Sequence, residues 1–193
     1  MCYAPETILN VAGCAGVGKT SLINAVFGEE ITVFRPSDEI RKFAAEHSLP
    51  LASRFDYASV HDTMHEHDPD FMVKKIMGLR GKVVLDGLRV HVQAEKLQTV
   101  APDYHTVGLV CPDEVRFSRV INDPRRNNRP ETIPSSLQEF LEEEEHEIRN
   151  YGLLKVLDMH DVSPEKFNTD RPFKELAFDL TLALQRYGWS FQR

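Results

Sequence analysis

Hydrophobic and polar positions along the chain follow two alternating patterns. Short runs rich in Val, Ile and Leu predict buried strands, at residues 7–12, 31–34, 82–86, 106–110 and 153–157. The stretches between them carry apolar residues at helical spacing and predict helices, at residues 21–27, 39–46, 57–64, 70–79, 90–100, 113–121, 135–150 and 173–187. Buried strands that alternate with helices are typical of a parallel sheet with helices on both faces. The 193 residues are therefore expected to form one α/β domain.

A glycine-rich segment joins the first predicted strand to the first predicted helix. It reads Gly13-Cys14-Ala15-Gly16-Val17-Gly18-Lys19-Thr20 and matches the phosphate-binding pattern G-x-x-x-x-G-K-[ST]. Its glycines let the backbone N–H groups curl around an anion, and the helix N-terminus adds positive potential. The alternative is an ordinary glycine-rich turn, but this spacing rarely occurs by chance between a strand and a helix. The pattern therefore predicts an ATP site.

The residues of this loop have separate expected roles. Lys19 should reach the β- and γ-phosphates of ATP, and the Thr20 hydroxyl should ligate Mg²⁺. The positive potential of the loop should lower the pKa of the Cys14 thiol and make it reactive, and the open alternative is a side chain that only packs. The residues expected to hold the nucleotide are Gly13, Ala15, Gly16, Val17, Gly18, Lys19, Thr20 and Ser21.

A second motif follows the predicted strand at 82–86, which ends in Asp86-Gly87-Leu88-Arg89. A carboxylate at this strand end lies beside the phosphate loop and can hold Mg²⁺ directly or through water. Arg89 can bind two phosphate oxygen atoms at once. The alternative is a turn with a solvated arginine; next to a phosphate loop, we favour the functional interpretation.

A third motif starts the helix after the second predicted strand and reads Ser37-Asp38-Glu39-Ile40-Arg41. Arg41 lies one turn into this helix and could face a second phosphate, with Asp38 beside it as a substrate-binding residue. A surface helix capped by Asp38 is the open alternative.

Five arginines stand between residues 116 and 129 of an otherwise acidic chain. Phosphoryl transfer spreads negative charge over equatorial oxygens, and arginines on a closing segment would stabilise it. We therefore expect a lid region at 119–134, although a solvated basic face is the alternative and the one that suits Arg116. The residues expected to take part in catalysis are Lys19, Asp86, Arg119, Arg125, Arg126 and Arg129.

Composition narrows the class of partner. The formal net charge of −7 argues against a large nucleic-acid footprint, which needs surplus Lys and Arg, but leaves a small phosphate pocket open. Three cysteines without C-x-x-C spacing indicate a reducing compartment, and no apolar stretch is long enough for a signal peptide or a membrane span. We expect a cytoplasmic protein, as a monomer or a homodimer, without a membrane partner.

With these motifs together, the chain resembles the nucleoside-monophosphate-kinase group of P-loop kinases, which includes adenylate kinase and dephospho-CoA kinase. The resemblance runs from about residue 7 to 158 and includes the three motifs and Cys111-Pro112-Asp113-Glu114-Val115. It implies that Arg41 and Arg89 grip the acceptor phosphate, under a helical insert at 37–79. It implies that Arg119 and the lid arginines act on the donor phosphates. It also implies a five-stranded parallel sheet in the order 2-3-1-4-5.

The sequence therefore predicts an ATP- and Mg²⁺-dependent kinase that acts on a nucleoside monophosphate or a nucleotide-like phosphate. One alternative is a kinase that phosphorylates a hydroxyl of a cofactor precursor or of a modified base in DNA. A second alternative is a GTPase-type switch, which ranks lower because its guanine-reading N-K-x-D motif is missing from the chain.

Overall fold

The computed structural model describes residues 4–51, 53–124, 133–189 and 191. The predicted lid arginines Arg125, Arg126 and Arg129 lie outside these residues. In chain order the elements are β1 (Thr7–Ala12), α1 (Lys19–Val26), β2 (Thr32–Phe34), α2 (Pro36–His47), α3 (Arg54–His67), α4 (Phe71–Met77), β3 (Lys82–Asp86), α5 (His91–Val100), β4 (Tyr104–Val110), α6 (Asp113–Ile121), α7 (Leu137–Tyr151), α8 (Leu153–Asp158), β5 (Phe167–Asn168) and α9 (Phe173–Gln185).

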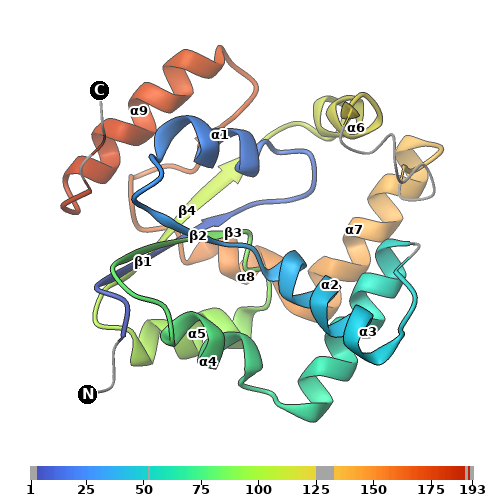
Figure 1. Cartoon of the computed structure of the whole chain (residues 1–193). Helices are drawn as coiled ribbons and strands as arrows, with labels where there is room; N and C mark the ends of the chain where they lie inside the picture. Colours follow the sequence, from blue (N-terminus) through green and yellow to red (C-terminus); the bar gives the residue numbers. More distant parts are fainter. Residues whose placement is uncertain (1–3, 52, 125–132, 190, 192–193) are drawn as a thin grey trace.

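The strands form one five-stranded sheet in the order β2-β3-β1-β4-β5, and every pair is parallel. This confirms the predicted fold class and strand order. Figure 1 shows α1 and α9 on one face of the sheet and α4, α5 and α8 on the other. Because all strands run the same way, their carboxyl ends meet at one edge, where α/β proteins bind ligands.

The central strand β1 divides its side chains between two cores. Ile8 and Ala12 pack with the helices of one face, and Leu9 and Val11 pack with those of the other. Side chains alternate across a strand, so a strand buried on both faces must be apolar at consecutive positions. This is the physical reason why β1 is mostly apolar and why all of its residues 7–12 are buried.

One predicted strand is wrong. Residues 153–157 belong to the helix α8, and the fifth strand is the two-residue segment Phe167–Asn168. In α8 the buried residues are Leu153, Val156 and Leu157, while Leu154 is half exposed. This spacing is helical, and a short apolar run cannot by itself distinguish a buried strand from a buried helix.

The helix predicted at 57–64 is longer and begins at Arg54. A reciprocal capping box sets its start: the backbone N–H of Asp56 donates to Ser53 Oγ (3.1 Å), and the backbone N–H of Ser53 donates to Asp56 Oδ2 (2.7 Å). Figure 1 shows α2, α3 and α7 gathered on one flank of the molecule. None of the helices within the described ranges is long and apolar enough to cross a membrane.

Candidate active site

The glycine-rich loop has the backbone geometry of an anion-binding loop between β1 and α1. Gly16 and Gly18 have φ angles of +74° and +96°, which disfavour residues with a Cβ. A Cβ on Gly16 would also lie 2.4 Å from the carbonyl oxygen of Arg116, so α6 packs directly onto the loop. Gly18 is the N-cap of α1, and the loop therefore directs the helix N-terminus at its ligand.

Lys19 is the buried cation of the loop. Its Nζ donates hydrogen bonds to the carbonyl oxygens of Gly13 (2.7 Å) and Cys14 (2.9 Å). Burial, and after it the charge of Arg89, lower the pKa of Lys19 to about 7, although the charge of Asp86 acts in the opposite direction. Gly87 leaves room for this side chain, because a Cβ there would lie 2.9 Å from Lys19 Cε. The cation of this site is therefore held with little compensating negative charge.

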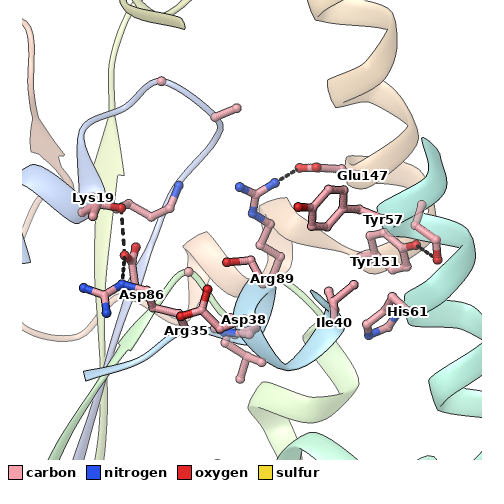
Figure 2. A pocket seen from close by; sticks show the side chains of 18 of the residues that line it. Lys19, Arg35, Asp38, Ile40, Tyr57, His61, Asp86, Arg89, Glu147 and Tyr151 are labelled. Carbon is pink, nitrogen blue, oxygen red and sulfur yellow. Dashed lines mark hydrogen bonds and ion pairs between the residues drawn. The ribbon is translucent and has the colours of Figure 1, made fainter. Parts of the chain in front are cut away.

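Thr20 and Asp86 form the predicted metal pair. The Thr20 hydroxyl donates to Asp86 Oδ2 (2.8 Å). Figure 2 shows Asp86 beside Lys19. A hydroxyl and a carboxylate are the hard oxygen ligands that Mg²⁺ uses at kinase sites, so the donor set fits this ion. Arg35 Nε lies 3.5 Å from the same carboxylate oxygen. The sequence analysis missed Arg35, whose signal was a basic residue between the second strand and its helix.

The turn after β3 is fastened to β1. The Asn10 side chain donates to the backbone carbonyl of Leu88 (3.1 Å) and accepts from the backbone N–H of Leu88 (3.1 Å). Asn10 is fully buried at a strand position that otherwise carries apolar side chains. These two hydrogen bonds fix the backbone next to Arg89 and set where its side chain enters the cavity.

Two neighbouring arginines of α6 have different surroundings. The Arg119 guanidinium donates one hydrogen bond to the hydroxyl of Thr169 (3.0 Å) and one to the backbone carbonyl of Thr169 (2.8 Å). Arg119 also lines the cavity near Gly18. Arg119 therefore lies next to the phosphate loop. It is held there by a hydroxyl and a carbonyl rather than by a carboxylate.

Arg116 contradicts the expectation of a solvated side chain, because only 3% of it is exposed. It donates to the carbonyl of Ala15 (3.1 Å) and to both carboxylate oxygens of Glu144 (2.5 and 2.6 Å). Burial opposes its charge, but the hydrogen bonds to Glu144 and Asp113 more than offset this and raise its pKa. Arg116 therefore ties α7 to the phosphate loop through Glu144.

The prediction for Cys14 is also wrong in sign. Burial, together with the nearby charge of Glu144, raises the pKa of the Cys14 thiol to about 11. Arg116 and Lys19 oppose this shift but do not reverse it. Cys14 therefore packs as a protonated side chain and is not an activated thiolate.

A cavity of about 830 Å³ runs from the phosphate loop to the helices α2, α3 and α7. At its far end, Arg41 donates to the Tyr57 hydroxyl (2.9 Å) and to Asp38 (2.5 Å). Arg89 forms an ion pair with Glu147 of α7. The remaining wall at this end is formed by Ile40, Phe55, Ala58, His61, Met72, Val90, Gln93, His146 and Tyr151.

The cavity brings most of the predicted site residues together. Lys19, Thr20, Asp86 and Arg119 lie at the donor end, and Asp38, Arg41 and Arg89 line the opposite end. Figure 2 shows Lys19 and Asp86 on one side of the space and Arg89, Tyr57 and His61 on the other. The roles of Arg125, Arg126 and Arg129 stay predictions because these residues lie outside the described part of the chain.

Comparison with known families identifies the domain. The chain belongs to the family described as an AAA domain, which matches residues 10–150. This range extends from β1 to α7 and includes both ends of the cavity. No curated protein is significantly similar to the chain.

Three solved structures are similar to the chain at low sequence identity. A gluconokinase from Sinorhizobium meliloti 1021 is 17% identical, with 94% of this chain and 93% of that chain covered and a TM-score of 0.49. A sugar kinase from Janibacter sp. HTCC2649 is 16% identical, with 94% and 95% covered and a TM-score of 0.48. The Deinococcus radiodurans tunicamycin resistance protein is 12% identical, with 97% and 99% covered and a TM-score of 0.48. These findings do not single out the nucleoside-monophosphate-kinase group.

Proposed function

We propose that this protein is an ATP- and Mg²⁺-dependent kinase that transfers the γ-phosphoryl group to a small molecule. The observation that carries the proposal is the single cavity, which has the phosphate loop at one end and Arg41 and Arg89 at the other. A donor and an acceptor bound at these ends would face each other within one space. The first candidate acceptor is a nucleoside monophosphate or a nucleotide-like phosphate, and we propose that the protein acts in the cytoplasm as a monomer or homodimer.

The residues of the donor end have complementary tasks in such a transfer. The loop N–H groups and Lys19 would bind the β- and γ-phosphates, and Arg119 would stabilise charge on the transferred group. Thr20 and Asp86 would hold Mg²⁺, which when bound neutralises charge on the β- and γ-phosphates. An acceptor oxygen would attack the γ-phosphorus as the bond to the ADP oxygen breaks. The walls formed by α2 and α3 would limit the entry of water, which would otherwise accept the phosphoryl group.

A second candidate acceptor is a molecule that offers a hydroxyl and carries no phosphate at this end of the cavity. The observation that favours it is that both Arg41 and Arg89 already have a carboxylate partner, Asp38 and Glu147 respectively. In this case the two arginines would orient hydrogen-bonding groups of an uncharged acceptor.

A transfer assay with γ-labelled ATP tests the proposal. The acceptor panel consists of nucleoside monophosphates, the corresponding nucleosides, dephospho-CoA and hydroxymethylated DNA. We expect Mg²⁺-dependent labelling of a small-molecule acceptor. No transfer to any acceptor, together with no binding of ATP in the presence of Mg²⁺, would refute the kinase assignment.

The metal pair has its own test in the same assay. Asp86→Asn removes the carboxylate charge while it keeps the side-chain shape, so half-maximal turnover should need roughly tenfold more Mg²⁺, or more. Asp158→Asn is the matched control, because Asp158 pairs with Lys166 at the surface, away from the phosphate loop. An unchanged Mg²⁺ titration for Asp86→Asn would make Asp86 a structural residue.

A further inference from the structure

The ion pair between Arg89 and Glu147 lies inside the cavity at its acceptor end. Both side chains line the space, and 28% of Arg89 and 16% of Glu147 is exposed. Figure 2 shows Glu147 reaching from α7 to the guanidinium group of Arg89. A ligand group that binds Arg89 therefore also meets the carboxylate of Glu147.

The position of Glu147 is set by contacts of α7 on both sides of it. Three residues earlier, Glu144 is buried and accepts two hydrogen bonds from Arg116. Four residues later, the Tyr151 hydroxyl donates to Asp62 (3.2 Å) and lies 3.3 Å from the carbonyl of Ala58. Residues three and four apart lie on the same face of a helix, so these anchors hold the face that carries Glu147 toward the cavity. The carboxylate is therefore a fixed part of the acceptor end.

Within the described residues, each of the two arginines at the acceptor end has a carboxylate partner. Arg41 is paired with Asp38 and Arg89 with Glu147, and each carboxylate lines the same cavity as its partner. At the donor end, by contrast, Lys19 contacts backbone carbonyls and Arg119 contacts Thr169. A phosphate monoester carries a charge of about −1.5 to −2 at pH 7 and would be repelled by a fixed carboxylate within a few ångströms.

We infer that Glu147 determines the specificity of the acceptor end, and that it selects an uncharged, hydroxyl-bearing group beside Arg89 and disfavours a phosphate monoester there. The inference rests on the proposed kinase function and favours its second candidate acceptor. A hydroxyl is both a donor and an acceptor, so it can accept from the Arg89 guanidinium and donate to the Glu147 carboxylate. The dianion of a phosphate monoester has no O–H to donate and carries two negative charges, so the Glu147 carboxylate would repel it.

Binding of inorganic phosphate to the acceptor end tests this inference. The donor end is first saturated with Mg²⁺ and the non-hydrolysable analogue AMP-PNP, so that the phosphate loop is filled. Phosphate is then titrated by calorimetry into the wild type, Glu147→Gln and Glu143→Gln. Glu143 is the matched control, because it also lies on α7 and lines the cavity. Thermal unfolding and AMP-PNP affinity verify that each variant is folded.

We expect Glu147→Gln to bind phosphate roughly tenfold more tightly than the wild type, because one close like charge is removed. Glu143→Gln should change the affinity about twofold at most, since its carboxylate is not the one that pairs with Arg89. Equal changes of phosphate affinity in the two variants would mean that the overall negative charge of α7, and not Glu147 in particular, disfavours phosphate. That result would overturn the inference. Unchanged or weaker phosphate binding by Glu147→Gln would overturn it as well, because Glu147 would then only orient Arg89.

The double variant Arg89→Ala/Glu147→Gln gives a second measurement, because it removes both charges of the pair and leaves no carboxylate unpaired. If Glu147 neutralises Arg89, loss of the whole pair should change the affinity for phosphate about threefold at most. A loss of affinity of roughly tenfold or more would mean that Arg89 is available to phosphate despite Glu147, and would overturn the inference. Failure of every variant and of the wild type to bind AMP-PNP would refute the proposed kinase function itself, and the inference with it.

Discussion

The donor and acceptor ends of the cavity differ in how they hold their cations. At the donor end, Lys19 contacts backbone carbonyls and Arg119 contacts Thr169, and within the described part of the chain neither cation forms an ion pair with a carboxylate. At the acceptor end, Arg41 and Arg89 are both paired with carboxylates. An unpaired buried cation is costly unless an anion arrives, whereas a paired cation is already satisfied. The comparison teaches that the donor end is prepared for a strongly anionic ligand and the acceptor end for a weakly charged one.

Removal of the donor-end cation should have the largest effect. Lys19→Ala should lower phosphoryl transfer by about three orders of magnitude or more, because no other loop side chain can neutralise the β- and γ-phosphates. The measurement is turnover with γ-labelled ATP, with thermal unfolding as the folding check. Lys166→Ala is the control, because Lys166 pairs with Asp158 at the surface. Turnover near that of the wild type in Lys19→Ala would place the donor phosphates elsewhere.

Loss of the buried Arg116, which contacts the phosphate loop, should have the largest effect on the free energy of unfolding. Arg116→Ala should lower the free energy of unfolding by about 3–5 kcal/mol, because it leaves the buried Glu144 carboxylate without its partner. Chemical denaturation measures this change. Arg149→Ala is the control, because its ion pair with Glu145 is exposed and should be worth less than about 1 kcal/mol. Equal losses in the two variants would mean that the contact between α7 and the loop does not stabilise the fold.

Arginine substitutions at the two ends should separate their roles. Arg119→Ala should lower both ATP affinity and turnover, whereas Arg41→Ala and Arg89→Ala should act on the acceptor with ATP affinity retained. Each acceptor-end truncation should cost about 2–5 kcal/mol of transition-state stabilisation, because it leaves a carboxylate partner unpaired. Separate KM values for ATP and acceptor provide the measurement. Reduced ATP affinity with unchanged acceptor affinity in Arg89→Ala would reverse the assignment of the ends.

The smallest predicted effect is the uptake of a proton by Lys19 when ATP binds. Burial holds the pKa of Lys19 at about 7 in the empty loop, and ATP phosphates should raise it by stabilising the ammonium form. At pH 8, ATP binding should therefore be accompanied by uptake of up to about one proton, and this uptake should fade below pH 7. Calorimetry in buffers of different ionisation enthalpy measures it. Lys19→Met should abolish the uptake, and an uptake that persists in that variant would assign the proton to another group.

The lowered pKa of Lys19 also determines the direction in which the free energy of unfolding changes with pH. The pKa of Lys19 is lower in the folded chain than its ordinary value of 10.5, so the unfolded chain binds more protons between these values. The contribution of Lys19 to the free energy of unfolding of the empty protein should therefore rise as the pH increases from about 7 to 10.5. Lys19→Met should lack this part of the pH dependence when urea unfolding is measured across that range.

The resemblance to P-loop kinases implied the sheet order, while the sequence by itself determined four of the five strands and the whole phosphate loop. These features depend on neighbours along the chain: the apolar run of β1, the spacing from Gly13 to Thr20, and Asp86 at a strand end. Local spacing also explains the error at 153–157, since four or five apolar residues fit a buried strand and a buried helix equally well.

The tertiary structure alone decided which charges meet. Arg116 with Glu144, and Arg89 with Glu147, are pairs formed between α6 and α7 and between the turn after β3 and α7. The four consecutive glutamates from 142 to 145 look alike in the sequence, yet Glu144 is buried and Glu145 is exposed. Helix orientation sets which side faces the loop, and only packing sets that orientation. The sequence could therefore identify a phosphate-binding loop, whereas the charge balance of the acceptor end, and with it the acceptor class, required the fold.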